Sequence, residues 1–189
     1  MDKSISCINY GLNDRHEKDS TEYKMILSLP VDLFQYELGR ILHDVLLSFV
    51  TSLVLCLLVA IESFFMPVTV SLLACMGAIL GIFIASLWEI PLYSWISRVT
   101  NLYVSIAISF VGSLVAIWVN TYPIGKILPY TWSALMPVRL IKMHVNGLLI
   151  KSSEGMPNAA WTMLASILLF LVLSCLSAFF FKKQVIKNA

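Results

Sequence analysis

The sequence predicts an all-α membrane protein with four transmembrane helices, a cytoplasmic amphipathic helix and short extracellular re-entrant or interfacial helices. Four apolar stretches lead to this prediction, and they cover roughly residues 45–65, 68–88, 102–119 and 159–181. Each is close to the roughly 20 helical residues that cross a hydrocarbon core about 30 Å thick. Hydrophobic residues make up 59% of the 189 residues, and the mean hydropathy of +0.85 lies outside the range of soluble domains.

These spans leave little chain for a separate soluble domain. We expect residues 1–44 to form a cytoplasmic N-terminal segment and residues 45–189 to form one transmembrane domain. The lipid bilayer is then the main partner. The net charge of +2 is small, so it does not indicate a nucleic-acid partner.

The element that precedes the first span is predicted to be a short amphipathic helix. Pro30 interrupts the chain, Asp32 is a suitable N-cap, and Gln35 stands at the third position of a capping box. The residues that follow, including Glu37 and Arg40, mix charged and apolar side chains at helical spacing. Such a helix lies along the cytoplasmic membrane surface. It either anchors the segment to the membrane or docks a cytoplasmic partner.

Small and polar residues recur at every fourth position of the spans, which places each series on one helix face. In the second span these residues are Gly77, Gly81 and Ala85, and they predict close helix packing. The third span carries a row of serines that includes Ser105 and Ser109. That row either packs against another helix or lines a polar path.

Two connections are predicted to differ in kind. The second span should end near Pro91, among aromatic residues typical of the membrane interface, and a tight turn should lead into the third span. The connection 120–158 is rich in proline but also in apolar residues. It predicts one or two short helices that dip into the outer membrane surface, with Asn146 and Gly147 as a helix-stop signal.

The distribution of basic residues predicts that both termini are cytoplasmic. With four spans, nine Lys and Arg residues fall on the side of the termini and four on the opposite side. Basic residues favour the cytoplasmic side of a membrane protein.

No pattern in the sequence indicates catalysis. The four cysteines form no CxxC pair, no GxxxxGK[ST] phosphate loop is present, and no histidine lies inside a predicted span. An intramembrane protease would need paired carboxylates and histidines, or a serine with a histidine partner, within the spans. We therefore expect no enzyme activity, no metal site and no cofactor bound by this chain.

Three segments resemble the permease subunits of exporter-type ABC transporters. They are YKMILSLPVDLFQYELGRIL before the first span, LWEIPLYSWISR at the end of the second, and ILPYTWSALMPVRLIKMHVNGLL before the last. The likeness covers roughly residues 20–185 and is nearest to the permeases that protect bacterial producers of lantibiotics. Permeases of this class have six spans, so the resemblance implies that this chain lacks the first two.

The resemblance also implies two groups of site residues. The first group would contact a separate ATPase subunit and consists of Leu29, Pro30, Val31, Asp32, Phe34, Tyr36, Glu37 and Arg40. The second group would lie on the extracellular helices, where substrate can be met, and consists of Tyr130, Trp132, Arg139, Asn146 and Gly147.

The implied function is that of a membrane-spanning subunit of an ATP-driven exporter. Its cargo would be a lantibiotic or a similar amphipathic antimicrobial peptide, expelled from the bacterial plasma membrane for self-protection. ATP and Mg²⁺ would bind the separate ATPase subunit, and a second permease chain, identical or a sister, would complete the pathway. The alternative is a small membrane-embedded immunity or binding protein that acts without an ATPase.

Overall fold

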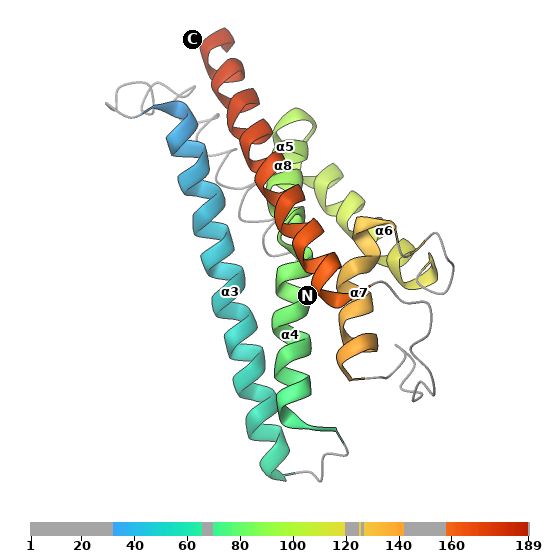
Figure 1. Cartoon of the computed structure of the whole chain (residues 1–189). Helices are drawn as coiled ribbons and strands as arrows, with labels where there is room; N and C mark the ends of the chain where they lie inside the picture. The colour runs from blue at the N-terminus through green and yellow to red at the C-terminus, as the bar shows by residue number, and fades with distance from the viewer. Residues whose placement is uncertain (1–31, 66–69, 120–124, 126, 142–157, 189) are drawn as a thin grey trace. The chain divides into compact units, whose positions relative to one another are not determined.

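The computed structural model of the chain describes residues 32–65, 70–119, 125, 127–141 and 158–188 (Figure 1). Within these ranges the chain forms helices and no strand. In chain order the helices are α3 (Leu33–Phe65), α4 (Leu72–Ser86), α5 (Glu89–Val99), α6 (Leu102–Val119), α7 (Pro129–Leu140) and α8 (Ala159–Asn188).

Three of these helices are long and apolar enough to cross a membrane. They are α3, α6 and the part of α8 over Ala159–Ile186. A fourth candidate exists if the bent pair α4 and α5 counts as one span. For the described residues, the prediction of an all-helical fold is therefore confirmed, and three or four of these helices are apolar enough to be membrane spans.

The start of α3 differs from the prediction. In place of a separate amphipathic helix and a span from residue 45, one continuous helix runs over Leu33–Phe65. Asp32 caps this helix as predicted, because the Phe34 N–H donates to Asp32 Oδ1 at 3.3 Å. No proline interrupts residues 33–65, so the backbone hydrogen-bond ladder continues from the polar segment into the apolar one. The predicted boundary at residue 44 thus falls inside a helix.

The segment after the second span was not predicted to be helical, but α5 occupies it, and the predicted tight turn into the third span follows α5 at Thr100 and Asn101. Helix α4 ends at Ser86, and the Leu87 N–H bonds to the Ile84 carbonyl at 3.4 Å. Pro91 explains the break, since it has no N–H to donate to the Leu87 carbonyl four residues earlier. As the third residue of α5, Pro91 stands where a missing N–H leaves no helical bond unmade.

Helix α6 begins immediately after α5 because Asn101 caps it. The Val104 N–H donates to Asn101 Oδ1 at 2.9 Å, and the Ser105 N–H to the Asn101 carbonyl at 3.2 Å. The cap satisfies backbone donors that would otherwise lack a partner at the start of the helix. A two-residue junction therefore suffices between Val99 and Leu102.

Contacts divide the chain into two units. The first contains the described residues of 1–46, 88–110 and 169–189. It has a small core of Leu33, Phe181 and Val185, with Tyr36 packed against it.

The second unit contains the described residues of 47–87 and 111–168, and in it α4 and α7 lie side by side (Figure 1). The Ser166 hydroxyl of α8 donates to the Ile84 carbonyl of α4 at 2.8 Å. A Cβ on Gly81 would contact Met163 at 3.2 Å and Leu140 at 3.4 Å, so this glycine lets neighbouring side chains approach α4 closely.

Small and hydroxyl-bearing side chains occupy many of the buried helix positions. They include Ser52, Ala78, Ala85, Ser94, Ser105, Ser109, Ala116, Thr162, Ser166, Ser174, Ser177 and Ala178. Many large apolar side chains are exposed, and Phe64, Leu73 and Trp118 are 85%, 81% and 79% exposed. This distribution suits a bilayer, where lipid solvates large apolar groups and small residues let helices pack closely.

Candidate functional site

A buried ion pair joins α3 and α5 in the first unit. The side chains of Glu37 and Arg98 are 0% and 2% exposed, and Arg98 Nη2 donates to Glu37 Oε1. Burial of either charge alone is strongly unfavourable, whereas a paired and hydrogen-bonded charge is tolerated. Glu37 lies in a stripe of buried residues with Leu33 and Ile41, at four-residue spacing on one face of α3.

Two serine hydroxyls complete the cluster. Arg98 Nη2 donates to Ser94 Oγ at 2.6 Å and to Ser177 Oγ at 2.7 Å. The same hydroxyls donate to Glu37 Oε1 at 3.2 Å from Ser94 and 3.3 Å from Ser177. Each serine thus bridges cation and anion. Nη2 carries two hydrogens, so its three acceptor oxygens share them.

The cluster joins α3, α5 and α8, because its members come from all three helices. Arg98 also donates through Nε to the Ser94 carbonyl at 3.3 Å, which holds the guanidinium against its own helix. Its carbon Cζ lies 5.1 Å from the centroid of the Phe181 ring on α8, within cation–π range. Tyr36 of α3 stacks on that ring at a centroid distance of 6.2 Å.

A second, exposed ion pair lies at the same end of α3. Lys182 Nζ of α8 contacts Asp32 Oδ1 at 3.0 Å, and the two side chains are 45% and 48% exposed. The hydrogen bond from Lys182 and the bond from the Phe34 N–H lower the pKa of the Asp32 carboxyl below its usual value. Exposed pairs of this kind add little to stability.

Further charges of α3 surround the buried pair. Arg40 Nη1 lies 3.8 Å from Glu37 Oε2, so the carboxylate has cations on both sides. Asp44, one turn further, is 6% exposed. The described residues include no group of three or more His, Cys, Asp and Glu side chains that could hold a metal ion. In this cluster the buried Glu37 carboxylate and the guanidinium groups of Arg98 and Arg40 neutralise one another.

The residues predicted to contact an ATPase subunit have different surroundings. Asp32 is exposed, while Phe34, Tyr36 and Arg40 are half-buried at the start of α3. Glu37 is fully buried, so its carboxylate contacts α5 and α8 and does not reach the surface. Leu29, Pro30 and Val31 lie outside the described residues.

The residues predicted for the extracellular helices lie partly on α7. Tyr130, Trp132 and Arg139 are half-buried there, and burial lowers the pKa of the Arg139 guanidinium. Asn146 and Gly147 lie outside the described residues.

The three small residues predicted for packing on α4 have different surroundings. Ala85 is fully buried, and a Cβ on Gly81 would lie 3.2–3.5 Å from side chains of α7 and α8. A Cβ on Gly77 would meet no atom of the described chain within 4 Å. Their shared role in close helix packing stays a prediction.

Sequence reasoning missed Ser94, Arg98 and Ser177 as members of one site. A partial signal was present, because Glu37 interrupts an apolar stripe of α3 and a buried carboxylate requires a cation. Ser94 and Arg98 also stand four residues apart on one helix face. The pairing itself could not be read, since Glu37 is 61 residues from Arg98 and 140 from Ser177.

Comparison of the chain with family models, curated proteins and solved structures found no match.

Proposed function

We propose that this chain is a membrane-embedded permease subunit of an ATP-driven exporter, and that its cargo is a lantibiotic or similar antimicrobial peptide. The proposal starts from the resemblance of three segments to exporter-type ABC permeases. The presence of three or four candidate membrane spans supports it. The chain sits in a bacterial plasma membrane with both termini in the cytoplasm, as the bias of basic residues favours.

The observation that carries the proposal is the way in which the start of α3 is held. An external motor can move a membrane helix only if the gripped segment is firmly joined to the helices behind it. The Glu37–Arg98 pair, bridged by Ser94 and Ser177, supplies such a joint between α3, α5 and α8. Buried charges resist separation, because each would be left desolvated and without its counter-charge.

The accessible side of this segment is the docking surface of the proposal. Asp32 is exposed, and the half-buried ring of Phe34 follows it by two residues. Aromatic side chains with adjacent charge are frequent anchors at protein interfaces. Glu37 acts differently from its neighbours, since it transmits a displacement to α5 and α8 and does not touch the ATPase subunit.

The remaining parts of the transporter are supplied by other chains. ATP and Mg²⁺ bind the ATPase subunit, and a second permease chain, identical or a sister, completes the pathway. In the proposed topology α7 faces the extracellular side, where its half-buried Trp132 and Arg139 offer an aromatic and a cationic contact to an amphipathic peptide.

Co-purification tests the proposal. The full chain is tagged, extracted from its host membrane in mild detergent, and the eluate is assayed for ATP hydrolysis and for nucleotide-binding subunits by mass spectrometry. Phe34→Ala is expected to lower recovery of the ATPase subunit about ten-fold, the size of effect seen when an aromatic anchor is removed. The matched control is Phe64→Ala, which removes the same ring from the opposite end of α3, where it is 85% exposed.

The outcomes separate the two functions left open by the sequence. Recovery of an ATPase subunit that depends on Phe34 and not on Phe64 supports the permease. If the unaltered chain brings down no ATPase subunit, the permease proposal fails and the immunity protein that works without an ATPase takes its place. Equal recovery with both variants would remove the docking surface from the start of α3.

A further inference from the structure

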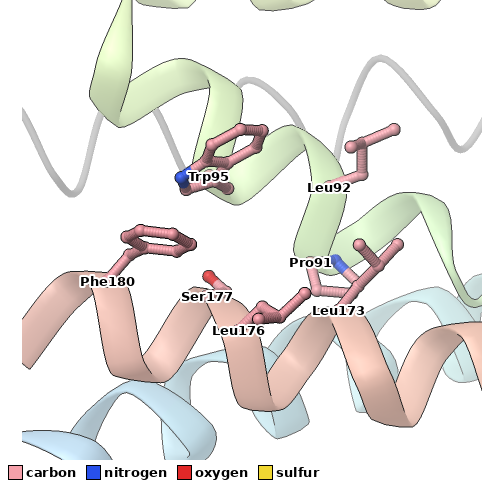
Figure 2. Close-up of a pocket in the computed structure, with 7 residues that line it drawn as sticks. All are labelled: Pro91, Leu92, Trp95, Leu173, Leu176, Ser177 and Phe180. Carbon is pink, nitrogen blue, oxygen red and sulfur yellow. The ribbon is translucent and has the colours of Figure 1, made fainter.

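Helices α5 and α8 enclose a small apolar hollow in the first unit (Figure 2). Leu173, Leu176 and Phe180 of α8 line one side, and Pro91 and Trp95 of α5 line the other. The hollow has a volume of about 70 Å³, and the rings of Trp95 and Phe180, with centroids 5.9 Å apart, stand at one end of it. It has room for a few methylene groups and no more.

The hollow opens outward. Trp95, Leu176 and Phe180 are 39%, 47% and 44% exposed, so the groups at its rim are accessible from outside the chain. Leu173 and Leu176 belong to the apolar part of α8 that is long enough to span a membrane. In a bilayer, the molecules that reach this rim first are the acyl chains of lipids.

A cation stands in line with the hollow. Leu173, Leu176, Phe180 and Lys183 follow one another at intervals of three and four residues, which places them on one face of α8. The row rises about 15 Å from Leu173 to Lys183. Lys183 is exposed and has no ion-pair partner among the described residues, whereas the neighbouring Lys182 pairs with Asp32.

We infer that this face of α8 binds one anionic phospholipid. An acyl chain lies along the apolar row and fills the hollow, and the phosphate meets the ammonium group of Lys183. A basic residue next to a membrane favours anionic over zwitterionic lipid by about five-fold. The apolar row alone would take any acyl chain, so the lysine gives the site its preference.

The inferred lipid also touches the buried ion pair indirectly. Ser177 lines the hollow, and its hydroxyl accepts a hydrogen bond from Arg98 Nη2 at 2.7 Å. A filled hollow keeps water away from this side of the pair. The lipid would therefore stabilise the joint between α3, α5 and α8.

Trp95 reports on the site directly. A variant is made in which Trp88, Trp118, Trp132 and Trp161 are replaced by Phe, and it is reconstituted in phosphatidylcholine vesicles. Brominated phosphatidylglycerol or brominated phosphatidylcholine is then added as a quencher of Trp95 fluorescence. We expect phosphatidylglycerol to bind about five-fold more tightly. A second variant that keeps Trp118 alone, a residue 79% exposed on α6, should show no preference between the two lipids.

Two charge variants of equal net charge locate the headgroup. Lys183→Gln should abolish the preference for phosphatidylglycerol at Trp95. Lys182→Gln removes the same charge one residue away, on a side chain already paired with Asp32, and should keep most of the preference. Equal binding of the two lipids at Trp95, or a preference unaffected by Lys183→Gln, would overturn the inference.

A second measurement avoids the multiple tryptophan changes. Native mass spectrometry of the unaltered full chain should show one retained phosphatidylglycerol under conditions that remove phosphatidylcholine, and Lys183→Gln should lose it. Absence of quenching at Trp95 by either brominated lipid would mean that protein, such as a second copy of the chain or a bound peptide, covers the hollow. That result would also overturn the lipid site.

Discussion

Glu37 is a buried carboxylate that joins three helices of the first unit. The Glu37 side chain is 0% exposed, so no solvent stabilises the charge of its carboxylate. Arg98 provides the counter-charge, and Ser94 and Ser177 each donate a hydrogen bond to the same carboxylate oxygen. These partners come from helices that the sequence separates widely, so this one residue connects α3 with both α5 and α8.

Removal of one member of the pair should be far more damaging than removal of both. Glu37→Met leaves Arg98 as a buried cation and should lower the free energy of unfolding by about 3–5 kcal/mol. Arg98→Met should cost less, because Arg40 still lies 3.8 Å from the Glu37 carboxylate. The double variant should recover most of the loss, and unfolding in detergent micelles would measure all three.

The exposed pair provides the control for this cycle. Asp32→Asn removes the negative charge that pairs with Lys182, whose side chain is 45% exposed, and should hardly change stability. If the double variant is as unstable as the sum of the single ones, the coupling between Glu37 and Arg98 is absent and the joint proposed here does not exist.

At the scale of the element, local residues decide where helices start and stop. Asp32 caps α3, Asn101 caps α6, and Pro91 lies in the first turn of α5, just after the break that ends α4. The two caps depend on residues only two or three positions apart, so both can be recognised from the sequence. The sequence also predicted that the second span ends near Pro91, but it did not predict the helix α5 that follows.

Glycines within the helices should respond very differently to substitution. A Cβ on Gly112 of α6 would lie 2.6 Å from the Tyr130 ring of α7, whereas a Cβ on Gly77 of α4 would meet nothing within 4 Å. Gly112→Ala should therefore lower the free energy of unfolding by about 1–3 kcal/mol through overpacking. Gly77→Ala should be neutral or slightly stabilising, because alanine has the higher helix propensity. Unfolding in micelles measures both changes.

The cause of the Gly112 effect can be checked by a second substitution. Tyr130→Ala removes the ring, so Gly112→Ala should cost nothing further in that background. A loss that persists without the ring would show that Gly112 serves some other purpose. Gly112 was not singled out from the sequence, although Gly112 and Ala116 form a pair of small residues at four-residue spacing.

At the scale of the whole molecule, the high hydropathy of the sequence and the exposure of its apolar side chains both indicate a membrane environment. The exterior of the described helices carries many Leu, Phe, Val and Trp side chains, and many buried positions carry Ser, Thr and Ala. This pattern is the reverse of a soluble protein, in which large apolar side chains are mostly buried. It follows from the loss of any hydrophobic drive between helices once lipid is the solvent.

The orientation in the membrane can be tested by thiol accessibility. Cys7, Cys56, Cys75 and Cys175 are first replaced by Ser or Ala, and single cysteines are then placed at Lys18 and Lys187. Both should resist an impermeant maleimide in intact cells and react after lysis, because the positive-inside bias puts these termini in the cytoplasm.

Position 151, in the connection 120–158, serves as the reference for the opposite side. Lys151→Cys should react in intact cells. Labelling of positions 18 and 187 from outside, with position 151 protected, would reverse the topology and remove the start of α3 from the reach of a cytoplasmic ATPase.

The sequence by itself predicted that the described residues form helices, three or four of them long and apolar enough to cross a membrane. Hydropathy is a sum over neighbouring residues, and the cost of unpaired backbone groups in lipid leaves the helix as the natural form of each apolar stretch. The cap at Asp32 could also be predicted, because it involves a residue only two positions away. Only the tertiary structure decided which charges are buried and with whom, because Glu37, Arg98 and Ser177 meet across 61 and 140 residues of chain. A contact of that kind depends on the packing of whole helices, which no local pattern of residues encodes.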